Sequence, residues 1–237
     1  NEVKSITNSG NRPPHLAAVI VGNDGASLTY VGSKVRACEK VGFESTLVNL
    51  EESITEQELL NKVNELNSDD KIDGYIIQLP LPKHIDTQNI LMAVDPKKDV
   101  DGFHPTNFGK MALKLPTFIS ATPNGIMELL KRYNIPTDGK HTVVLGRSDI
   151  VGKPISILMG LKTNPGNSTV TLAHSRTNNI EDLIKQADIL ISALGVPNFI
   201  REHMIKDGAI IIDVGITRVP DDSVKGYKIV GDVDFIN

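Results

Sequence analysis

The segment that decides the fold is residues 143–154, which read VVLGRSDIVGKP. An apolar run ends at Gly146 and a helix-like stretch follows, so the segment predicts a buried strand, a tight glycine turn and the start of a helix. Backbone N–H groups at such a helix start can hold the pyrophosphate of a nucleotide. The usual G-x-G-x-x-G spacing is absent, because Arg147 and Ser148 stand in the turn and the next glycine is Gly152. An ordinary tight turn therefore remains an equal alternative.

The strand that follows indicates which nucleotide would bind. Residues 168–177 read STVTLAHSRT, and basic and hydroxyl side chains stand where NAD-dependent enzymes usually place Asp or Glu. Arg147 and Arg176 together can neutralise a 2′-phosphate, and Ser175 can donate a hydrogen bond to it. We therefore expect NADP as the cofactor. For Arg176 alone, a solvated surface position is the alternative.

Outward from this segment, strands and helices alternate in two sets. The first set predicts strands at 15–22, 43–50 and 74–78 and helices at 27–41, 55–66 and 87–94. The second predicts strands at 142–145, 169–173, 188–193 and 209–214, and helices at 122–133, 150–161 and 180–186, with Pro123 at a first helical position. This alternation predicts an α/β protein with two domains, each a mainly parallel sheet flanked by helices.

The boundary between the two sets is expected in residues 95–121. This stretch holds Pro96, Pro105 and Pro116 and shows no clean periodicity, so we expect an irregular crossing that carries functional loops. The predicted domains are residues 1–121 and 122–237.

Composition excludes several classes of protein. The chain has 237 residues, 40% hydrophobic and 23% charged, with a formal net charge of −4, so we expect no nucleic-acid partner and no membrane partner. Its one cysteine, Cys38, excludes a disulfide framework and a multi-cysteine zinc site, and it fits a reducing compartment. We expect no metal site. Because the sequence begins with Asn1 and not with Met, we expect that an N-terminal segment is missing.

One helical face in the first set carries Ser27, Tyr30 and Lys34, at positions i, i+3 and i+7. A Lys four residues after a Tyr is similar to the acid/base pair of several dehydrogenases. A partly buried Lys suits proton transfer near neutral pH, because desolvation favours its uncharged form. An amphipathic helix with a solvent-reaching Lys is the alternative.

Two more polar residues are expected at the same edge of the first sheet. Gln78 ends the third strand, and Asp101 lies in the crossing. An amide and a carboxylate suit a ring with adjacent donor and acceptor edges, such as a pterin. The alternative is structural: Gln78 satisfies loop backbone groups, and Asp101 or Asp99 caps a turn.

Taken in order, these segments resemble a known family. The motifs are Ser27-x-x-Tyr30-x-x-x-Lys34, Gln78-Leu-Pro-Leu-Pro82, Lys98-Asp-Val-Asp-Gly102, Thr122-Pro123, Gly146-Arg-Ser-x-Ile-Val-Gly152-x-Pro154 and Gly231-Asp-Val-Asp-Phe235. Over nearly the whole chain they are similar to bifunctional methylenetetrahydrofolate dehydrogenase/methenyltetrahydrofolate cyclohydrolase, the FolD family. The resemblance implies folate between two α/β domains, NADP on a Rossmann-like second domain, and a cytoplasmic homodimer that acts on tetrahydrofolate one-carbon derivatives and serves purine biosynthesis.

The resemblance also implies roles for individual residues. Lys34 would be the catalytic lysine, and Tyr30, Gln78 and Asp101 would complete the catalytic set. These four residues and Ser27 would bind the substrate, with Asp101 gripping the pterin. The residues that would hold NADP are Gly146, Arg147, Ser148, Ser175 and Ile216, to which the charge argument adds Arg176.

The sequence departs from the family pattern at four places. Only residues 1–7 could correspond to the family's N-terminal helical segment, and the family continues beyond Phe235 into a Pro- and Gly-rich loop and a final helix. In addition, residues 120–123 read SATP where many members have PCTP, and residues 160–167 look longer than usual. Two alternatives remain: another two-domain NADP dehydrogenase, such as one for shikimate, and a folate- or nucleotide-binding module without catalysis.

Overall fold

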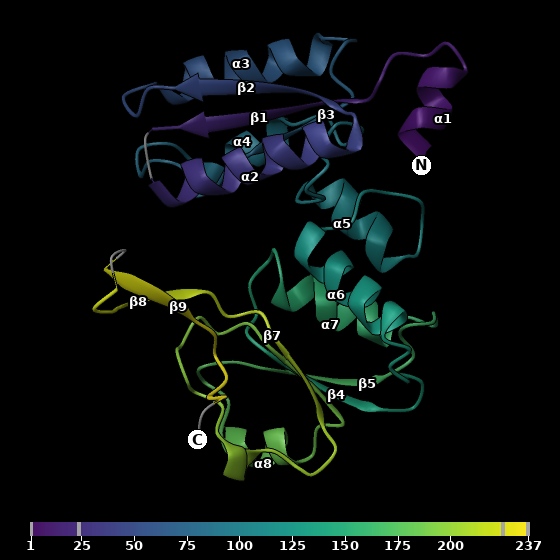
Figure 1. Ribbon diagram of the computed structural model, residues 1–237, viewed down its shortest axis with the longest axis vertical. Helices are drawn as coiled ribbons and strands as arrows, with labels where there is room; N and C mark the ends of the chain where they lie inside the picture. The colour runs from purple at the N-terminus through teal and green to yellow at the C-terminus, as the bar shows by residue number, and fades with distance from the viewer. Residues whose placement is uncertain (1, 23–24, 224–225, 236–237) are drawn as a thin grey trace. The chain divides into compact units, whose positions relative to one another are not determined.

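The computed structural model describes residues 2–22, 25–223 and 226–235, and the side chains of residues 25–30 lie outside this description. The chain divides into two compact units. The first unit comprises residues 1–110 and 117–119, and the second comprises residues 111–116 and 120–237. Figure 1 shows the elements of both units.

The first unit is built around a three-stranded parallel sheet. Its helices are α1 (Glu2–Asn8), α2 (Gly25–Val41), α3 (Glu56–Ser68), α4 (Thr87–Ala93) and the start of α5 (Pro105–Ala112), and its strands are β1 (His15–Val21), β2 (Glu44–Leu50) and β3 (Gly74–Ile77). The strand order is β2-β1-β3, with β1 parallel to both neighbours.

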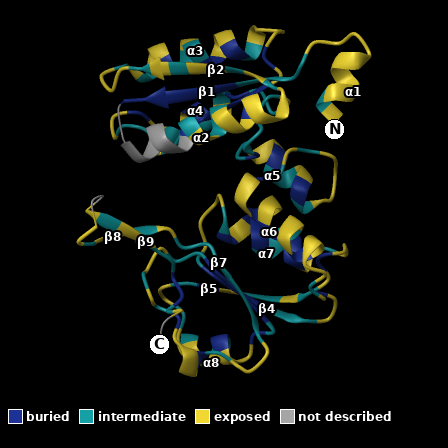
Figure 2. Ribbon diagram, in the orientation of Figure 1, coloured by how far each residue is buried: buried dark blue, intermediate teal, exposed yellow. Residues whose placement is uncertain are grey.

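Both faces of this sheet are covered, which explains the unbroken apolar run in β1. Ala17 and Val19 pack in one core with α3 and α4, whereas Ala18 and Ile20 pack in a second core with Val31 of α2. A strand that is buried on both faces needs no polar alternation. Figure 2 shows β1 buried over most of its length, with exposed residues on the outer sides of the helices.

The second unit contains a four-stranded parallel sheet. The strands are β4 (His141–Leu145), β5 (Thr169–Ala173), β6 (Ile189–Ser192) and β7 (Ile210–Asp213), in the order β5-β4-β6-β7. The helices are α6 (Ala121–Arg132), α7 (Gly152–Gly160), α8 (Ile180–Lys185) and the 3₁₀ helix η1 (Glu202–Met204). The chain leaves β4 towards β5 and later returns to β6 on the other side of β4. This topological switch point is where open α/β sheets bind ligands.

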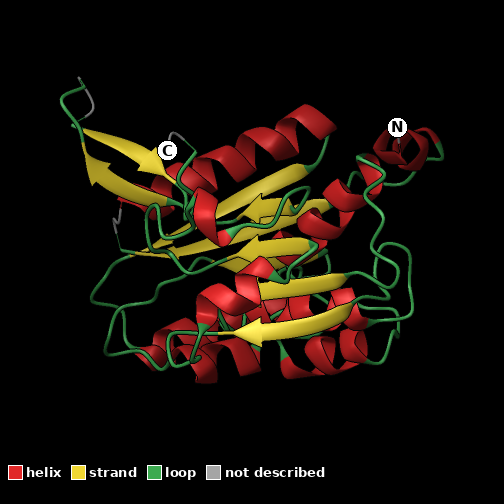
Figure 3. Cartoon of the chain, turned by 90° about the horizontal axis from the view of Figure 1, so that it is seen from below, coloured by secondary structure: helices red, strands yellow, loops and turns green. Residues whose placement is uncertain are grey.

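Three features differ from the sequence prediction. The crossing at residues 95–121 contains α5, which begins at Pro105 as a first helical residue. Pro123 lies in the third position of α6 instead of the first, because the helix already begins at Ala121. The prediction also missed an antiparallel hairpin, β8 (Thr217–Pro220) and β9 (Tyr227–Val230), which Figure 3 shows as a separate strand pair. Its strands have four residues each, too few for a clear alternation.

Local signals set several helix ends as expected. Thr55 and Glu58 form a reciprocal capping box at the start of α3. Gly42 follows α2 with a φ of 87°, a conformation that glycine adopts without steric cost. Within the described part of the chain, no helix has the length and apolar character to cross a membrane.

Candidate active site

In the first unit, the helix α2 carries the predicted lysine. Lys34 is half-buried in the third turn of α2 and interacts electrostatically with Asp101. The structure therefore brings together two residues that are 67 positions apart in the sequence (101 − 34). The side chains of Ser27 and Tyr30, which the sequence places on the same helix face, lie outside the described residues.

Asp99 and Asp101 have different surroundings. The buried Asp99 carboxylate accepts hydrogen bonds from the N–H of Phe103 (3.3 Å), the N–H of His104 (2.8 Å) and Nδ2 of Asn107 (2.9 Å). Asp101 forms no hydrogen bond with any residue in the described part. Burial raises its pKa, the Lys34 charge lowers the pKa in part, and the Asp99 charge adds to the increase. Asp99 is thus the structural carboxylate, whereas the acceptor oxygens of Asp101 are not used by any residue that the structure describes.

The segment that holds Asp101 is fixed against β3. An isolated parallel bridge pairs Asp99 with Tyr75, and the N–H of Tyr75 donates to the carbonyl of Lys98 at 2.9 Å. A Cβ at Gly74 would overlap Cγ1 of Val100, so glycine at the start of β3 permits this close approach. Backbone pairing therefore fixes the segment just before Asp101 against β3, while Lys34 comes from α2.

Gln78 follows β3 directly and has an unsatisfied acceptor. Its Nε2 donates to the carbonyl of Leu79 at 2.8 Å, while its buried Oε1 accepts no hydrogen bond from any residue that the structure describes. A buried acceptor without a partner costs about 1–3 kcal/mol, so this oxygen suits a donor on a bound molecule. A purely structural role, in which Gln78 bonds to loop backbone groups, explains why its amide nitrogen donates to Leu79. It does not explain why its amide oxygen is buried without a donor among the described residues.

In the second unit, two glycines shape the turn after β4. Gly146 has a φ of 106°, and a Cβ there would overlap the carbonyl oxygen of Ala193 after β6. A Cβ at Gly152 would overlap the carbonyl oxygen of Gly146. A larger residue at either position would overlap the backbone atoms against which the turn packs. Because both residues are glycine, neither has a side chain that could cover the backbone of the turn at this edge of the sheet.

Ser148 occupies the helix start that was expected to hold phosphate. Its Oγ accepts the N–H groups of Val151 and Gly152, both at 3.2 Å, and so caps α7. The N–H groups of residues 147–150 in the turn donate to no described residue. These open N–H groups, together with the positive end of α7, suit an anion.

The two arginines follow the ends of neighbouring strands. β4 and β5 pair with Leu145 opposite Ala173, so the turn with Arg147 and the turn with Ser175 and Arg176 begin at the same level of the sheet. All three of these side chains are exposed, and neither arginine forms an ion pair with a described residue. An exposed pair of unpaired cations beside a glycine turn fits a phosphorylated nucleotide. Ile216, which is 61% exposed, follows the end of β7.

Two residues that the sequence argument did not assign also belong to this edge. Asp213 is the last residue of β7. Asp232 lies in the Gly-Asp-Val-Asp stretch, a family motif to which the sequence assigns no role. Their side chains bond to the loops after β6 and β7. A carboxylate at a strand end beside glycines is visible in the sequence. The groups that donate hydrogen bonds to this carboxylate are visible only in the structure.

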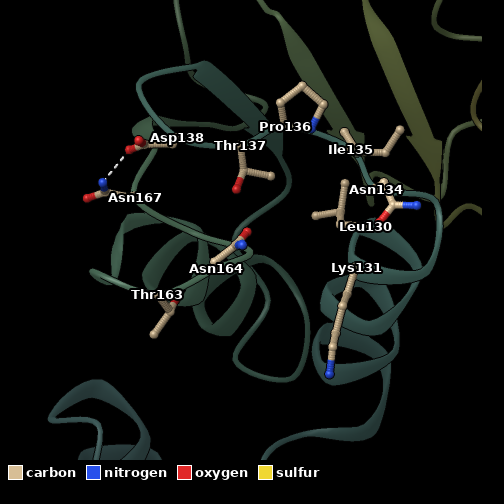
Figure 4. A pocket seen from close by; sticks show the side chains of 10 residues that line it. All are labelled: Leu130, Lys131, Asn134, Ile135, Pro136, Thr137, Asp138, Thr163, Asn164 and Asn167. Atoms are coloured by element: carbon tan, nitrogen blue, oxygen red, sulfur yellow. Dashed lines mark hydrogen bonds between the residues drawn. The ribbon is translucent and has the colours of Figure 1, made fainter.

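A hollow of about 580 Å³ lies elsewhere in the second unit (Figure 4). Its wall includes Asn134, Thr137 and Asn167, in the segments before β4 and before β5. It therefore opens at the amino end of the sheet, whereas ligands of open α/β sheets bind beyond the carboxyl ends. None of the predicted site residues lines it. Within the described residues, no group of three His, Cys, Asp or Glu side chains could hold a metal ion.

The fold and these residues define a two-domain α/β enzyme with a Rossmann-like nucleotide-binding domain. Two family models match the chain. The tetrahydrofolate dehydrogenase/cyclohydrolase catalytic domain matches residues 1–101, and the tetrahydrofolate dehydrogenase/cyclohydrolase NAD(P)-binding domain matches residues 120–237. The chain belongs to the tetrahydrofolate dehydrogenase/cyclohydrolase family, which confirms the family and the fold class that the sequence predicts.

Curated relatives and solved structures agree with this assignment. The bifunctional protein FolD of Flavobacterium johnsoniae is 67% identical over 99% of this chain and 80% of its own length. The FolD structure from Campylobacter jejuni is 43% identical, with a TM-score of 0.91 over 99% of this chain and 80% of that one. A FolD structure from Trypanosoma brucei, complexed with NADP and an inhibitor, is 38% identical, with a TM-score of 0.92 over 99% of this chain and 80% of that one.

Proposed function

We propose that this chain oxidises 5,10-methylenetetrahydrofolate to 5,10-methenyltetrahydrofolate with NADP, and then hydrolyses the product to 10-formyltetrahydrofolate. The observation that carries the proposal is the first-unit site, in which a half-buried Asp101, without a hydrogen bond to any described residue, interacts electrostatically with Lys34. A fold does not need such a pair, because the partial burial of a carboxylate to which no described residue donates a hydrogen bond costs stability. A ligand with adjacent N–H donors supplies what Asp101 lacks.

For folate binding, Asp101 and Gln78 have complementary tasks. An ionised Asp101 accepts hydrogen bonds from the amino group and ring N–H of a pterin. The unsatisfied Oε1 of Gln78 accepts one more. We place Ser27 and Tyr30 at the same substrate, because the sequence puts them on one helix face with Lys34.

The two reactions make different demands on Lys34. In the oxidation, a hydride leaves the methylene carbon for the nicotinamide that NADP supplies when bound, so the chain has only to align the reactants. In the hydrolysis, water attacks the methenyl carbon, and its oxygen loses both protons as it becomes the formyl carbonyl: one proton goes to solvent, and the ring nitrogen that is released when its bond to this carbon breaks gains the other. Lys34 is the acid/base group for these proton transfers, and the i, i+4 spacing in the sequence makes Tyr30 the candidate to hydrogen-bond it.

In the second unit, the residues at the turn after β4 fit NADP. The bare glycine turn and the open N–H groups of residues 147–150 receive the pyrophosphate. Gly146 and Ser148 shape this turn, Arg147 and Arg176 neutralise the 2′-phosphate, Ser175 donates to it, and Ile216 contacts the nicotinamide end. The Trypanosoma brucei relative is complexed with NADP, which supports the choice of this cofactor.

The proposal extends to assembly and location. β2 is an edge strand of its sheet, and Leu47 on this strand is 49% exposed, which suits a homodimer interface. Cys38 is a free and buried thiol, which fits the reducing cytoplasm. The 10-formyl product would feed one-carbon metabolism, including purine biosynthesis. Light scattering of the purified chain measures the assembly state, and a monomer would refute the dimer.

The test is to measure both rates on one preparation of the full chain. With methylenetetrahydrofolate, we expect formation of NADPH and of the methenyl product; with methenyltetrahydrofolate alone, we expect its decay to the formyl product above the uncatalysed rate. Shikimate with NADP serves as the control substrate. Binding of both ligands without turnover would leave a non-catalytic binding module, and turnover of shikimate would favour the other dehydrogenase class.

A further inference from the structure

Three neighbouring strands of the second unit end at one level. The register pairs Leu145 of β4 with Ser192 of β6, and Ser192 with Asp213 of β7. The segments that follow these strand ends therefore form one continuous rim, beyond the carboxyl ends where open α/β sheets bind ligands. Two of them, residues 193–196 and residues 214–216, are held by carboxylates.

Asp232 holds the loop after β6. Its carboxylate accepts hydrogen bonds from the N–H of Leu194 (2.7 Å), the N–H of Val196 (2.9 Å) and Oγ of Ser192 (2.9 Å). Asp232 and Ser192 are fully buried. Asp232 thus binds a loop that precedes it by about 40 residues, and these three donors to its carboxylate belong to that loop or to the strand end beneath it.

Asp213 holds the other loop and also Asp232. Its Oδ1 accepts the N–H of Gly215 (2.9 Å) and the N–H of Asp232 (2.9 Å), and its Oδ2 accepts the N–H of Val233 (3.0 Å). We call Asp213 and Asp232 the carboxylate clamp. It fixes the position of residues 193–196 relative to residues 214–216 and pins both ends of the β8–β9 hairpin.

Glycines allow the clamp to close. A Cβ at Gly215 would overlap Oδ1 of Asp232, and a Cβ at Gly231 would overlap Oδ2 of Asp213. Neither glycine has a positive φ, so the close approach and not the backbone conformation requires them. The Gly-Asp pair at 231–232 and the Asp-x-Gly stretch at 213–215 therefore act as one interlocked unit.

We propose that the carboxylate clamp is a positioning device for the nicotinamide end of NADP, an inference that rests on the proposed function. Three of the donors that it binds, the N–H groups of Leu194, Val196 and Gly215, belong to the rim loops, where fold stability alone would require no fixed geometry. Holding both loops before the dinucleotide arrives removes the entropic cost of ordering them on binding. Ile216, the proposed cofactor contact, follows Gly215 directly, so the hydrogen bond from the N–H of Gly215 to Asp213 also restricts the position of Ile216.

Asparagine cannot take the place of Asp232. All three groups that bond to the Asp232 carboxylate donate to it, and an amide offers one acceptor oxygen and one NH₂ donor group. At least one loop N–H would then face another N–H without an acceptor. Asp232→Asn keeps the size and shape of the side chain, so it tests the bonds and not the packing.

The experiment compares Asp232→Asn, Ser192→Ala and the control Asp222→Asn in the full chain. Asp222 is an exposed residue of the same hairpin and forms no hydrogen bond through its side chain with a described residue.

NADP is titrated without folate, and amide hydrogen exchange is followed by mass spectrometry or NMR. For Asp232→Asn we expect an NADP Kd about tenfold higher or more, and exchange at Leu194 and Val196 about tenfold faster, while the β4 amides stay protected. For Ser192→Ala we expect a Kd about 2–5-fold higher, and for Asp222→Asn no change beyond about twofold.

The outcomes separate this inference from the proposed function. If the unchanged chain binds no NADP, the proposed function fails at its cofactor. If it binds NADP and Asp232→Asn binds equally well, the clamp has no positioning role. If amide exchange in β4 also becomes faster in Asp232→Asn, the variant has lost structure more generally, and Ser192→Ala then decides. An NADP Kd of Ser192→Ala equal to that of the unchanged chain overturns the proposal. A raised NADP Kd of Ser192→Ala, with its β4 amides still protected, supports the proposal.

Discussion

Asp99 and Asp101 are two residues apart, yet only Asp99 has its carboxylate saturated by hydrogen bonds. Three donors of its own segment surround Asp99, whereas Asp101 has the Lys34 charge and no hydrogen bond among the described residues. The segment is pinned to β3 through Asp99, and this anchoring holds Asp101 at the site. The desolvation cost of the Asp101 carboxylate therefore arises at a place where a ligand with N–H donors can offset it.

This arrangement predicts a pH-dependent gain in stability for Asp101→Asn. The pKa of Asp101 is raised in the folded chain, mainly by burial, so its ionised form destabilises the fold at neutral pH. As the pH falls through the folded pKa, the folded state takes up the proton first and the penalty disappears. We expect a higher Tm than that of the unchanged chain at pH 7 and no difference below about pH 4, near the unfolded pKa. An equal or lower Tm at pH 7 would contradict the argument.

Asp101 also serves to test ligand specificity. Asp101→Ala should raise the Kd for folate about tenfold or more, because charge-assisted hydrogen bonds are lost, and leave the NADP Kd within about twofold. Titration of each ligand alone measures both constants. Asp70→Ala, at an exposed carboxylate of the same unit, is the control. The reverse pattern would move Asp101 to the cofactor site.

Lys34→Met should separate the two reactions. The hydrolysis needs proton transfer, so its kcat should fall by roughly 10²–10⁴-fold, whereas the dehydrogenase kcat should fall far less. Lys40→Met, at an exposed lysine in the last turn of α2, is the control on the same helix. Equal losses of kcat, or a change confined to KM, would remove Lys34 from the acid/base role.

The choice of NADP over NAD depends on two exposed cations. Arg147→Gln/Arg176→Gln should weaken NADP more than NAD, because each lost charge-assisted contact is worth roughly 1.5–3 kcal/mol. The measurement is the ratio of kcat/KM for NADP to that for NAD. Lys131→Gln/Lys185→Gln removes the same net charge from exposed positions of the same unit. A ratio that stays the same in the arginine variant would refute the assignment.

Gly152→Ala tests the closed turn after β4. The added Cβ would overlap the carbonyl oxygen of Gly146, and both positions are backbone, so no side chain can move aside. We expect a loss of about 1–3 kcal/mol in urea unfolding and a weaker NADP Kd. Gly125→Ala in α6 has nothing within 4 Å of the new Cβ and should gain roughly 0.5–1 kcal/mol. Tight NADP binding by Gly152→Ala would exclude this turn as the phosphate site.

Much of the fold follows from local sequence signals. The apolar run of β1, the glycine after α2 and the Thr55–Glu58 pair each act over a few residues, and the structure has a strand, a helix end and a capping box there. The sequence did not predict α5, because a proline in a stretch without clear periodicity indicates a break. In the structure, Pro105 is the first residue of this helix. The β8–β9 hairpin escaped because its alternation extends over only four residues in each strand.

The sequence by itself determined two parallel α/β sheets, their order along the chain and the motifs that mark the family, because periodicity and turn chemistry are local properties. Only the tertiary structure decided which of Asp99 and Asp101 is saturated, that Ser148 caps α7, and that Asp232 holds the loop after β6. The role of a polar side chain depends on which donors reach it. For Asp232 those donors lie 36–40 residues away in the chain, and folding alone brings them together.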